Sequence, residues 1–273
     1  MPPTTHRAAT CDPEPKVLVD REDAVLTIAI NRPAKANAID AEMIASLSHA
    51  YTRLSGDPTL RVAVVRGNGR HFTAGLDLAS LAPRLAAGGE GLIPDGGRDP
   101  WGMYGEPASK PVITAVHGRC FTAGLELVLN ADLCVAAEDT VFGQQEVSRG
   151  IVALGGATVR LPQRAGWGDA MRYLLTGDTF DAREARRMGI VQDVVPPGEQ
   201  LGRAMALAHR IAAQAPLAVQ ATLADARRAL SGPVAESAAS LRDDVGPRLF
   251  ATADATEGIT AMLERRSPVY TGA

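Results

Sequence analysis

The segment Gly118-Arg119-Cys120-Phe121-Thr122-Ala123-Gly124-Leu125-Glu126-Leu127 joins a turn of small residues to the start of an apolar helix. A second segment of the same kind, His71-Phe72-Thr73-Ala74-Gly75-Leu76-Asp77-Leu78, lies earlier in the chain. Backbone N–H groups at the start of a helix have no intrahelical acceptor, and small residues let a ligand oxygen approach them closely. Two such turns can therefore face one oxygen atom that develops negative charge. The alternative is tight packing of helices against a sheet, for which glycine is also used.

Two acidic residues near these turns are candidates for acid–base chemistry. Glu126 lies on an otherwise apolar helix, where burial raises the pKa of a carboxyl toward values that suit proton transfer at neutral pH. A salt bridge is the alternative explanation for Glu126. Glu146 follows a predicted strand and by itself would pass for a solvated loop acid. We treat Glu146 as functional because two donor turns and a second carboxyl accompany it. Donor turns of this kind are what a thioester carbonyl needs when it becomes an enolate.

The elements around the turns predict an α/β fold. The run Val62-Ala63-Val64-Val65 is typical of a strand buried on both faces, and Asp40 is a good N-cap for a following helix. Strands that alternate with helices imply right-handed crossovers and a mostly parallel sheet. Strands are expected at 24–31, 62–65, 111–116 and 133–136, and helices after Asp40 and at 124–129.

Three other segments differ from this pattern. Residues 82–109 contain many glycines and prolines with apolar residues between them, and we interpret them as a mobile flap that contacts a ligand or a neighbouring subunit, with disorder as the alternative. The polar, proline-rich residues 1–15 are interpreted as a disordered leader. Beyond Pro196-Pro197, helices are expected near 198–214, 216–230, 233–250 and 254–266.

Composition excludes several classes of protein. The 273 residues carry a formal charge of −3 without a polybasic run, which argues against a nucleic-acid partner. No stretch of about 18 uncharged apolar residues is present, so no membrane partner is expected. The N-terminus lacks the apolar core of a secretory signal, which favours a cytoplasmic location.

Cysteine and motif patterns exclude further classes. Cys11, Cys120 and Cys134 are an odd number without CxxC spacing, so we expect reduced thiols and no zinc site. The sequence has no P-loop, dinucleotide fingerprint, GxSxG elbow or HExxH motif, and its histidines lack metal-ligand spacing. His117, at the end of a predicted strand, is interpreted as structural. No metal is expected.

Several motifs, in order, resemble the crotonase (enoyl-CoA hydratase/isomerase) superfamily over about residues 24–195. The resemblance rests on Asn31-Arg32-Pro33 with Asn37-Ala38, Phe72 to Leu78, Lys110-Pro111-Val112, Gly118, Ala123 to Leu127, Ala131-Asp132, Phe142-Gly143-Gln144, Glu146, Gly150, Leu175 to Asp178, Ala182 to Ala185 and Gly189-Ile190-Val191. It implies a crotonase-like β-β-α spiral core over residues 16–197 that contains the active site. Residues 198–273 would then form a C-terminal helical oligomerisation region, and the protein a homotrimer or homohexamer.

The resemblance also implies roles for individual residues. The N–H groups of Leu76 and Ala123 would form the oxyanion hole, with Asp77 and Leu78 along the bound substrate. Ala123 replaces the more usual glycine; it keeps the N–H, but its Cβ narrows the pocket.

Glu126 and Glu146 match the two catalytic glutamates, whose joint presence is characteristic of hydratases. They would position one water for syn addition to a trans-2-enoyl-CoA, giving a 3-hydroxyacyl-CoA, with no cofactor because coenzyme A is part of the substrate. The alternatives are an enoyl-CoA isomerase or another CoA-thioester reaction of the superfamily, with Glu146 as the sole proton shuttle in the isomerase, and a non-catalytic acyl-CoA-binding protein.

One position departs from the pattern. Leu154 stands where hydratases often carry a glycine whose N–H helps to hold the catalytic water, and the leucine adds bulk beside that water and the acyl pocket. Arg32 and Lys35 lie near the loop that passes the adenine of CoA in the family, and they are candidates for phosphate contact. A solvated charged surface is the alternative for both.

Overall fold

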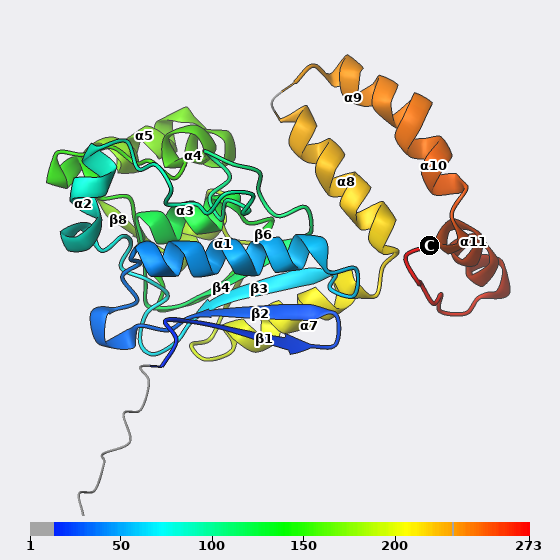
Figure 1. The fold of residues 1–273 in the computed structure, drawn as a ribbon, viewed down its shortest axis with the longest axis horizontal. Helices are drawn as coiled ribbons and strands as arrows, with labels where there is room; N and C mark the ends of the chain where they lie inside the picture. Colours follow the sequence, from blue (N-terminus) through cyan, green and yellow to red (C-terminus); the bar gives the residue numbers. More distant parts are fainter. Residues whose placement is uncertain (1–13, 231) are drawn as a thin grey trace, which may run out of the picture.

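The computed structural model describes residues 14–230 and 232–273, and a six-stranded sheet lies at its centre (Figure 1). The strand order is β1-β2-β3-β4-β6-β9, and every neighbouring pair is parallel except β1 with β2. The bounds are β1 Val17–Glu22, β2 Val25–Ile30, β3 Val62–Gly67, β4 Val112–Val116, β6 Leu133–Ala137 and β9 Asp193–Val195. The predicted mostly parallel sheet is confirmed.

Helices cover both faces of this sheet because its strands are apolar on both sides. Ala63 and Val65 of β3 join the core beneath α1 (Ala41–Gly56), whereas Val62 and Val64 pack on the opposite face with α7 (Gln200–Ala212). The side chain of Asp40 caps α1, as predicted, by accepting the Met43 N–H at 3.1 Å. The first helix of the 198–273 region thus packs on the sheet of its own chain.

A second, smaller sheet was not predicted. It consists of β5 (Arg119–Phe121), β7 (Val141–Gly143) and β8 (Thr179–Asp181), in that order. Phe142 of β7 stacks on Phe180 of β8 with ring centroids 5.5 Å apart. Strand β5 runs into the turn before Glu126 and β7 runs into Glu146, so this sheet sets the positions of both candidate carboxyls.

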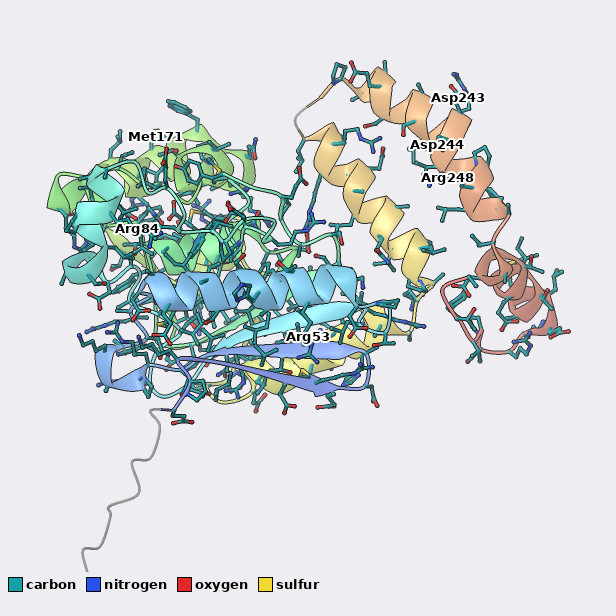
Figure 2. The ribbon with its side chains drawn as sticks, viewed as in Figure 1. Arg53, Arg84, Met171, Asp243, Asp244 and Arg248 are labelled. Carbon is teal, nitrogen blue, oxygen red and sulfur yellow. The ribbon has the colours of Figure 1, made fainter. Side chains whose placement is uncertain are left out.

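The C-terminal helices begin and end close to the predicted positions. After α7, the helices α8 to α11 form an arm that extends away from the central sheet (Figure 1). The expected helix over 233–250 is continuous but contains a π-helical turn, and Asp243, Asp244 and Arg248 lie along this part of the arm (Figure 2). The bounds are α8 Pro216–Ala229, α9 Val234–Ser240, η3 Leu241–Val245, α10 Gly246–Phe250 and α11 Ala253–Glu264.

Residues 82–109 were predicted to form a mobile flap, and the structure contradicts the alternative that this segment is disordered. Helix α2 (Leu78–Ala86) enters this segment, and Trp101 is buried in the main core. The carboxylate of Asp99 accepts hydrogen bonds from three backbone N–H groups of the same loop. These N–H groups therefore do not need water as a partner, and the loop can be ordered although it is rich in glycine. The segment is therefore packed onto the protein.

Two other expectations meet the structure only in part. Most of the predicted leader, residues 1–13, and with it Cys11, lies outside the described residues. Cys120 and Cys134 are buried free thiols. In the described ranges, none of the helices has the length and apolar character needed to cross a bilayer. The remaining helices are η1 Pro33–Lys35, α3 Ala123–Asn130, η2 Glu146–Arg149, α4 Ala157–Ala165, α5 Trp167–Thr176 and α6 Ala182–Arg187.

Candidate active site

The two small-residue turns lie side by side, joined by backbone hydrogen bonds. The Thr73 N–H donates to the Arg119 carbonyl at 3.0 Å, and the Phe121 N–H donates to the Thr73 carbonyl at 3.1 Å. A Cβ on Gly75, which has φ +99°, would overlap the side chain of Thr122. Glycine is thus required where the first turn touches the second.

Each turn presents a free amide. Leu76 is fixed by its neighbours, because Asp77 N–H donates to the Ile39 carbonyl and Ile39 N–H donates to the Gly75 carbonyl, both at 2.8 Å. Ala123 is the first residue of α3. Within the described part of the chain, neither the Leu76 nor the Ala123 N–H has a hydrogen-bond acceptor. Both groups predicted for the oxyanion hole can therefore bind a ligand oxygen.

Thr122 holds the second turn in an uncommon conformation. Its φ of 50° and ψ of −116° lie where β-branched residues are rarely found. Such strain costs about 1–3 kcal/mol and persists only where the surroundings enforce it. Here the Thr122 N–H donates to the Gly143 carbonyl at 2.8 Å, so the small sheet helps to set the direction of the next amide, that of Ala123.

Glu126 is a buried carboxyl whose pKa is raised. It is 3% exposed, and its Oε1 accepts the Ala157 N–H at 3.1 Å. Burial raises its pKa to about 7, repulsion from Glu146 adds to the rise, and the Ala157 N–H opposes it. Among the described residues no cation forms an ion pair with Glu126, which removes the salt-bridge explanation.

Glu146 is a second buried carboxyl, with one oxygen free. It is 9% exposed at the start of η2, and burial raises its pKa. Its Oε1 accepts a hydrogen bond from Gln144 Nε2 at 3.0 Å, whereas Oε2 is buried with no partner in the described residues. Because its charge acts on Glu126, the two carboxyls share one electrostatic environment.

Sequence reasoning did not identify two residues that support this pair. Gln144 is 1% exposed and orients Glu146 through its hydrogen bond. The only sign of this role in the sequence is an amide side chain two positions before the candidate acid. Gly155 lies against Glu126, because a Cβ there would stand 2.5 Å from Glu126 Oε2. Only the fold brings Gly155 and Glu126 together.

The predicted substrate-binding residues occupy different surroundings. Arg32 is paired inside the protein, since its Nη1 lies 2.7 Å from Asp77 Oδ2, and this hydrogen bond lowers the pKa of Asp77. Lys35 is exposed on η1 and has no ion-pair partner among the described residues. Leu78 is the first residue of α2, two positions after the free amide of Leu76. The side chain of Leu154 is 41% exposed, so it is accessible to a ligand. The structure thus leaves Lys35 freer than Arg32 to meet a phosphate.

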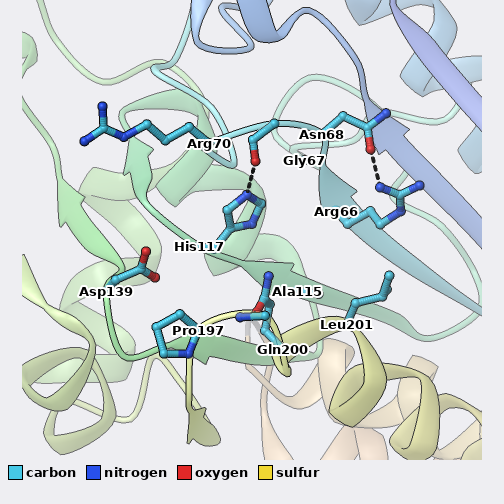
Figure 3. Close-up of a pocket in the computed structure, with 12 residues that line it drawn as sticks. Arg66, Gly67, Asn68, Arg70, Ala115, His117, Asp139, Pro197, Gln200 and Leu201 are labelled. Carbon is cyan, nitrogen blue, oxygen red and sulfur yellow. Dashed lines mark hydrogen bonds between the residues drawn. The ribbon is translucent and has the colours of Figure 1, made fainter.

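A separate cavity of about 580 Å³ lies between the end of β3 and the start of α7 (Figure 3). Arg66, Arg70 and His117 line it, and none of the predicted site residues is among the described residues that do so. His117 Nε2 lies 2.9 Å from the Gly69 carbonyl oxygen, which agrees with a structural role for this histidine. The candidate chemistry is located at the two turns and the two carboxyls.

Comparison with known proteins finds similar chains that are named as CoA-thioester hydratases or, at 37% identity, as carnitinyl-CoA dehydratases of Salmonella. The family model described as enoyl-CoA hydratase/isomerase matches residues 20–273. The enoyl-CoA hydratase EchA19 of Mycobacterium tuberculosis is 35% identical over 266 residues, which are 96% of this chain and 98% of that protein. The 2,3-dehydroadipyl-CoA hydratase of Escherichia coli is 34% identical over 258 residues, 94% of this chain and 99% of that protein.

Solved structures agree. The crystal structure of a probable enoyl-CoA hydratase/isomerase from Mycobacterium abscessus has a TM-score of 0.90 and 47% identity, and covers 94% of this chain and 99% of that one. The fold is therefore the crotonase fold with a helical C-terminal region that the sequence motifs implied. This chain belongs to the enoyl-CoA hydratase/isomerase family of the crotonase superfamily.

Proposed function

We propose that the protein is an enoyl-CoA hydratase that adds water to a trans-2-enoyl-CoA and forms a 3-hydroxyacyl-CoA. The observation that carries the proposal is the pair of buried carboxyls, Glu126 and Glu146, on the two segments that follow β5 and β7, where the charge of Glu146 helps to raise the pKa of Glu126. Acyl-CoA chemistry is common to the relatives, and two of the named relatives are hydratases. No cofactor is required, because coenzyme A enters with the substrate.

The proposed chemistry assigns one proton transfer to each carboxyl. Ionised Glu126 takes a proton from a water whose oxygen attacks C3, and neutral Glu146 gives its proton to C2 on the same face. The electrons of the double bond move to the thioester oxygen and form an enolate. That oxygen accepts hydrogen bonds from the N–H groups of Leu76 and Ala123. Exchange with solvent then returns the proton from Glu126 to Glu146.

Two alternatives make different use of this site. An isomerase needs one proton shuttle, and a second buried carboxyl would then be an unexplained cost. A non-catalytic binding protein would explain neither carboxyl. The free Oε2 of Glu146 and the raised pKa of Glu126 favour two-residue chemistry.

A panel of CoA thioesters tests the proposal. Trans-2-enoyl-CoAs of increasing chain length should lose the ultraviolet absorbance of the conjugated thioester as the 3-hydroxyacyl product forms. A 3-enoyl-CoA that gains this absorbance would instead identify an isomerase. If the protein binds the thioesters and converts none of them, it is a non-catalytic acyl-CoA-binding protein.

The rate should depend on pH because the two carboxyls must start in opposite states. The pKa of Glu126 is raised to about 7, so Glu126 gains a proton and stops acting as a base as the pH falls through that value. We expect kcat/KM to fall roughly tenfold per pH unit below about 7. A rate that is constant from about pH 5 to 9 would contradict these assignments.

Gly155→Ala should disturb the site without a direct change to either carboxyl. The new Cβ would stand 2.5 Å from Glu126 Oε2 and 2.8 Å from Cδ1 of Trp101, so the carboxyl must move. Misplacement by about 1 Å can lower kcat roughly 10²-fold. Gly168→Ala is the matched control, because a Cβ at Gly168 meets no atom within 4 Å, and its kcat should equal that of the parent. Equal rates for the two variants would argue against a catalytic position for Glu126.

The proposed assembly is a homotrimer or homohexamer that forms through the C-terminal arm. Large apolar side chains on the arm are exposed, and they lie at Leu230, Val234, Phe250, Met262 and Leu263. Large exposed apolar side chains on an arm that extends from the body favour burial against another copy of the chain. Sedimentation should therefore give a trimer or a multiple of it, whereas a monomer at micromolar concentration would disprove this part of the proposal.

A further inference from the structure

Residues 99–104, here called the 99–104 strap, are held in shape by one buried carboxylate. Asp99 is 1% exposed, and its two oxygens accept the N–H groups of Trp101 at 2.8 Å, Met103 at 2.9 Å and Tyr104 at 2.9 Å. The Gly102 N–H also donates to the Asp99 carbonyl at 3.1 Å. A buried carboxylate with three donors fixes a loop strongly, because separating any of them leaves an unpaired buried group.

The strap is attached to the helix that carries Glu126. At the start of α3, the indole Nε1–H of Trp101 donates to the Ala123 carbonyl at 2.9 Å. At the end of α3, Asn130 Nδ2 donates to the Pro100 carbonyl at 2.8 Å. On α4, Arg160 Nη2 donates to the Gly102 carbonyl at 2.9 Å. The strap thus holds α3 at both ends and links it to the helix whose first amide binds Glu126.

Trp101 lies between the two parts of the candidate site. Its indole N–H bonds to the carbonyl of Ala123, whose own N–H is one of the two free amides. Its ring and the carboxyl of Glu126 lie against the same residue, since a Cβ on Gly155 would be 2.8 Å from Trp101 Cδ1 and 2.5 Å from Glu126 Oε2. Trp101 is 8% exposed, so its ring excludes water from this side of Glu126.

We propose that Trp101 is a positioning residue, whose indole N–H holds the first turn of α3 so that the Ala123 amide and the Glu126 carboxyl face the same substrate. The inference rests on the proposed function for its catalytic readout. The strained φ of Thr122, directly before Ala123, gives an independent reason for such a restraint. A turn in that conformation relaxes unless neighbouring groups enforce it, and the bond from Trp101 acts on the next residue.

Trp101→Phe removes the N–H donor and keeps an aromatic ring in the core. The expected result is a kcat roughly tenfold lower with KM within about twofold of the parent, because the restraint matters most when charge develops on the thioester oxygen. Trp167→Phe is the matched control, since Trp167 is 73% exposed on α5, and its kcat and KM should be unchanged. Replacement of Trp101 by benzothienylalanine, which has the shape of tryptophan and no N–H, gives the same test if the phenylalanine variant does not fold.

A second measurement does not require hydration. A 3-oxoacyl-CoA can ionise to an enolate with its own ultraviolet band, and two free amides should stabilise that enolate when the thioester binds. Trp101→Phe should lower the affinity for the enolate roughly tenfold and leave the affinity for a saturated acyl-CoA unchanged. Loss of general stability would not separate the two ligands in this way.

Trp101→Ala tests the role of the ring. Removal of the indole lets water reach Glu126, and loss of desolvation lowers a carboxyl pKa, so the acid limb of the rate profile should move to lower pH. With Trp101→Phe the limb should stay in place while kcat falls.

The outcomes separate the two proposals. If the parent hydrates no enoyl-CoA, the proposed function fails, and the enolate measurement still decides the role of Trp101. If Trp101→Phe and the benzothienylalanine variant keep the parental kcat and enolate affinity, the positioning role is overturned while hydration stands. A parent that binds 3-oxoacyl-CoA without forming the enolate overturns the positioning role as well.

Discussion

Glu126→Gln and Glu146→Gln should each lower kcat for hydration by roughly 10²–10⁴-fold, the usual contribution of a positioned acid or base. Glutamine keeps the size of the side chain and an acceptor for the Ala157 N–H at position 126, but it cannot take a proton from water. At position 146 it cannot give a proton to C2. Steady-state kinetics with a trans-2-enoyl-CoA measure both losses, and the double variant should be little worse than either single one, since both transfers belong to one reaction.

The same substitutions should not weaken the fold. The pKa of Glu126 is raised from 4.5 to about 7, so its contribution to stability is complete below the unfolded pKa of about 4.5 and is lost as the pH rises through about 7. A glutamine, which never ionises, should therefore raise the free energy of unfolding at about pH 8 by up to about 3 kcal/mol. Denaturant unfolding at two pH values measures this gain.

Glu138→Gln is the control for a charge change without chemistry. Glu138 is exposed, and its side chain has no hydrogen-bond or ion-pair partner in the described residues. Its kcat and unfolding should match the parent. Should Glu126→Gln retain parental turnover, water activation by this carboxyl would be excluded, and the isomerase assignment to Glu146 alone would become the better one.

Much of the fold and the centre of the site can be predicted from the sequence because the signals are local. The apolar run of β3 predicted a strand with two buried faces, and the structure places Val62 and Val64 on one face and Ala63 and Val65 on the other. The two turns were predicted from small residues at strand–helix junctions, and a carboxyl on an apolar helix predicted burial of Glu126. Each of these signals needs only a few neighbouring residues.

What could not be predicted depends on contacts between distant residues. Strands β5, β7 and β8 have three residues each, too few for an alternating pattern. The glycine-rich composition around Trp101 predicts a loop, whereas the order of that loop depends on the Ala123 carbonyl, 22 positions away. Arg32 was expected near a phosphate because it lies by the loop that passes the adenine of CoA in the family, but its partner Asp77 lies 45 positions along the chain. Local pattern has no access to such pairings.

Ala123→Pro should abolish one of the two oxyanion donors while it leaves α3 with an acceptable first residue. Proline is favoured at the first position of a helix, where the N–H has no intrahelical partner, and it occupies that position naturally in α8 as Pro216. Loss of one oxyanion donor typically lowers kcat roughly 10²–10³-fold. The expected result is a loss of that size in hydration, together with loss of the enolate band of a bound 3-oxoacyl-CoA.

Ala253→Pro is the matched control for this substitution. Ala253 is the exposed first residue of α11, and the preceding Thr252 has φ −79° and ψ 154°, which suits a residue before proline. This variant should keep the parental rate and the parental unfolding curve. Thr122, before Ala123, is strained already, so Ala123→Pro must be shown to unfold cooperatively before its rate is interpreted. A folded Ala123→Pro protein with parental turnover would mean that the thioester oxygen is not stabilised at the start of α3, and the roles given to Trp101 and the second turn would then be wrong together.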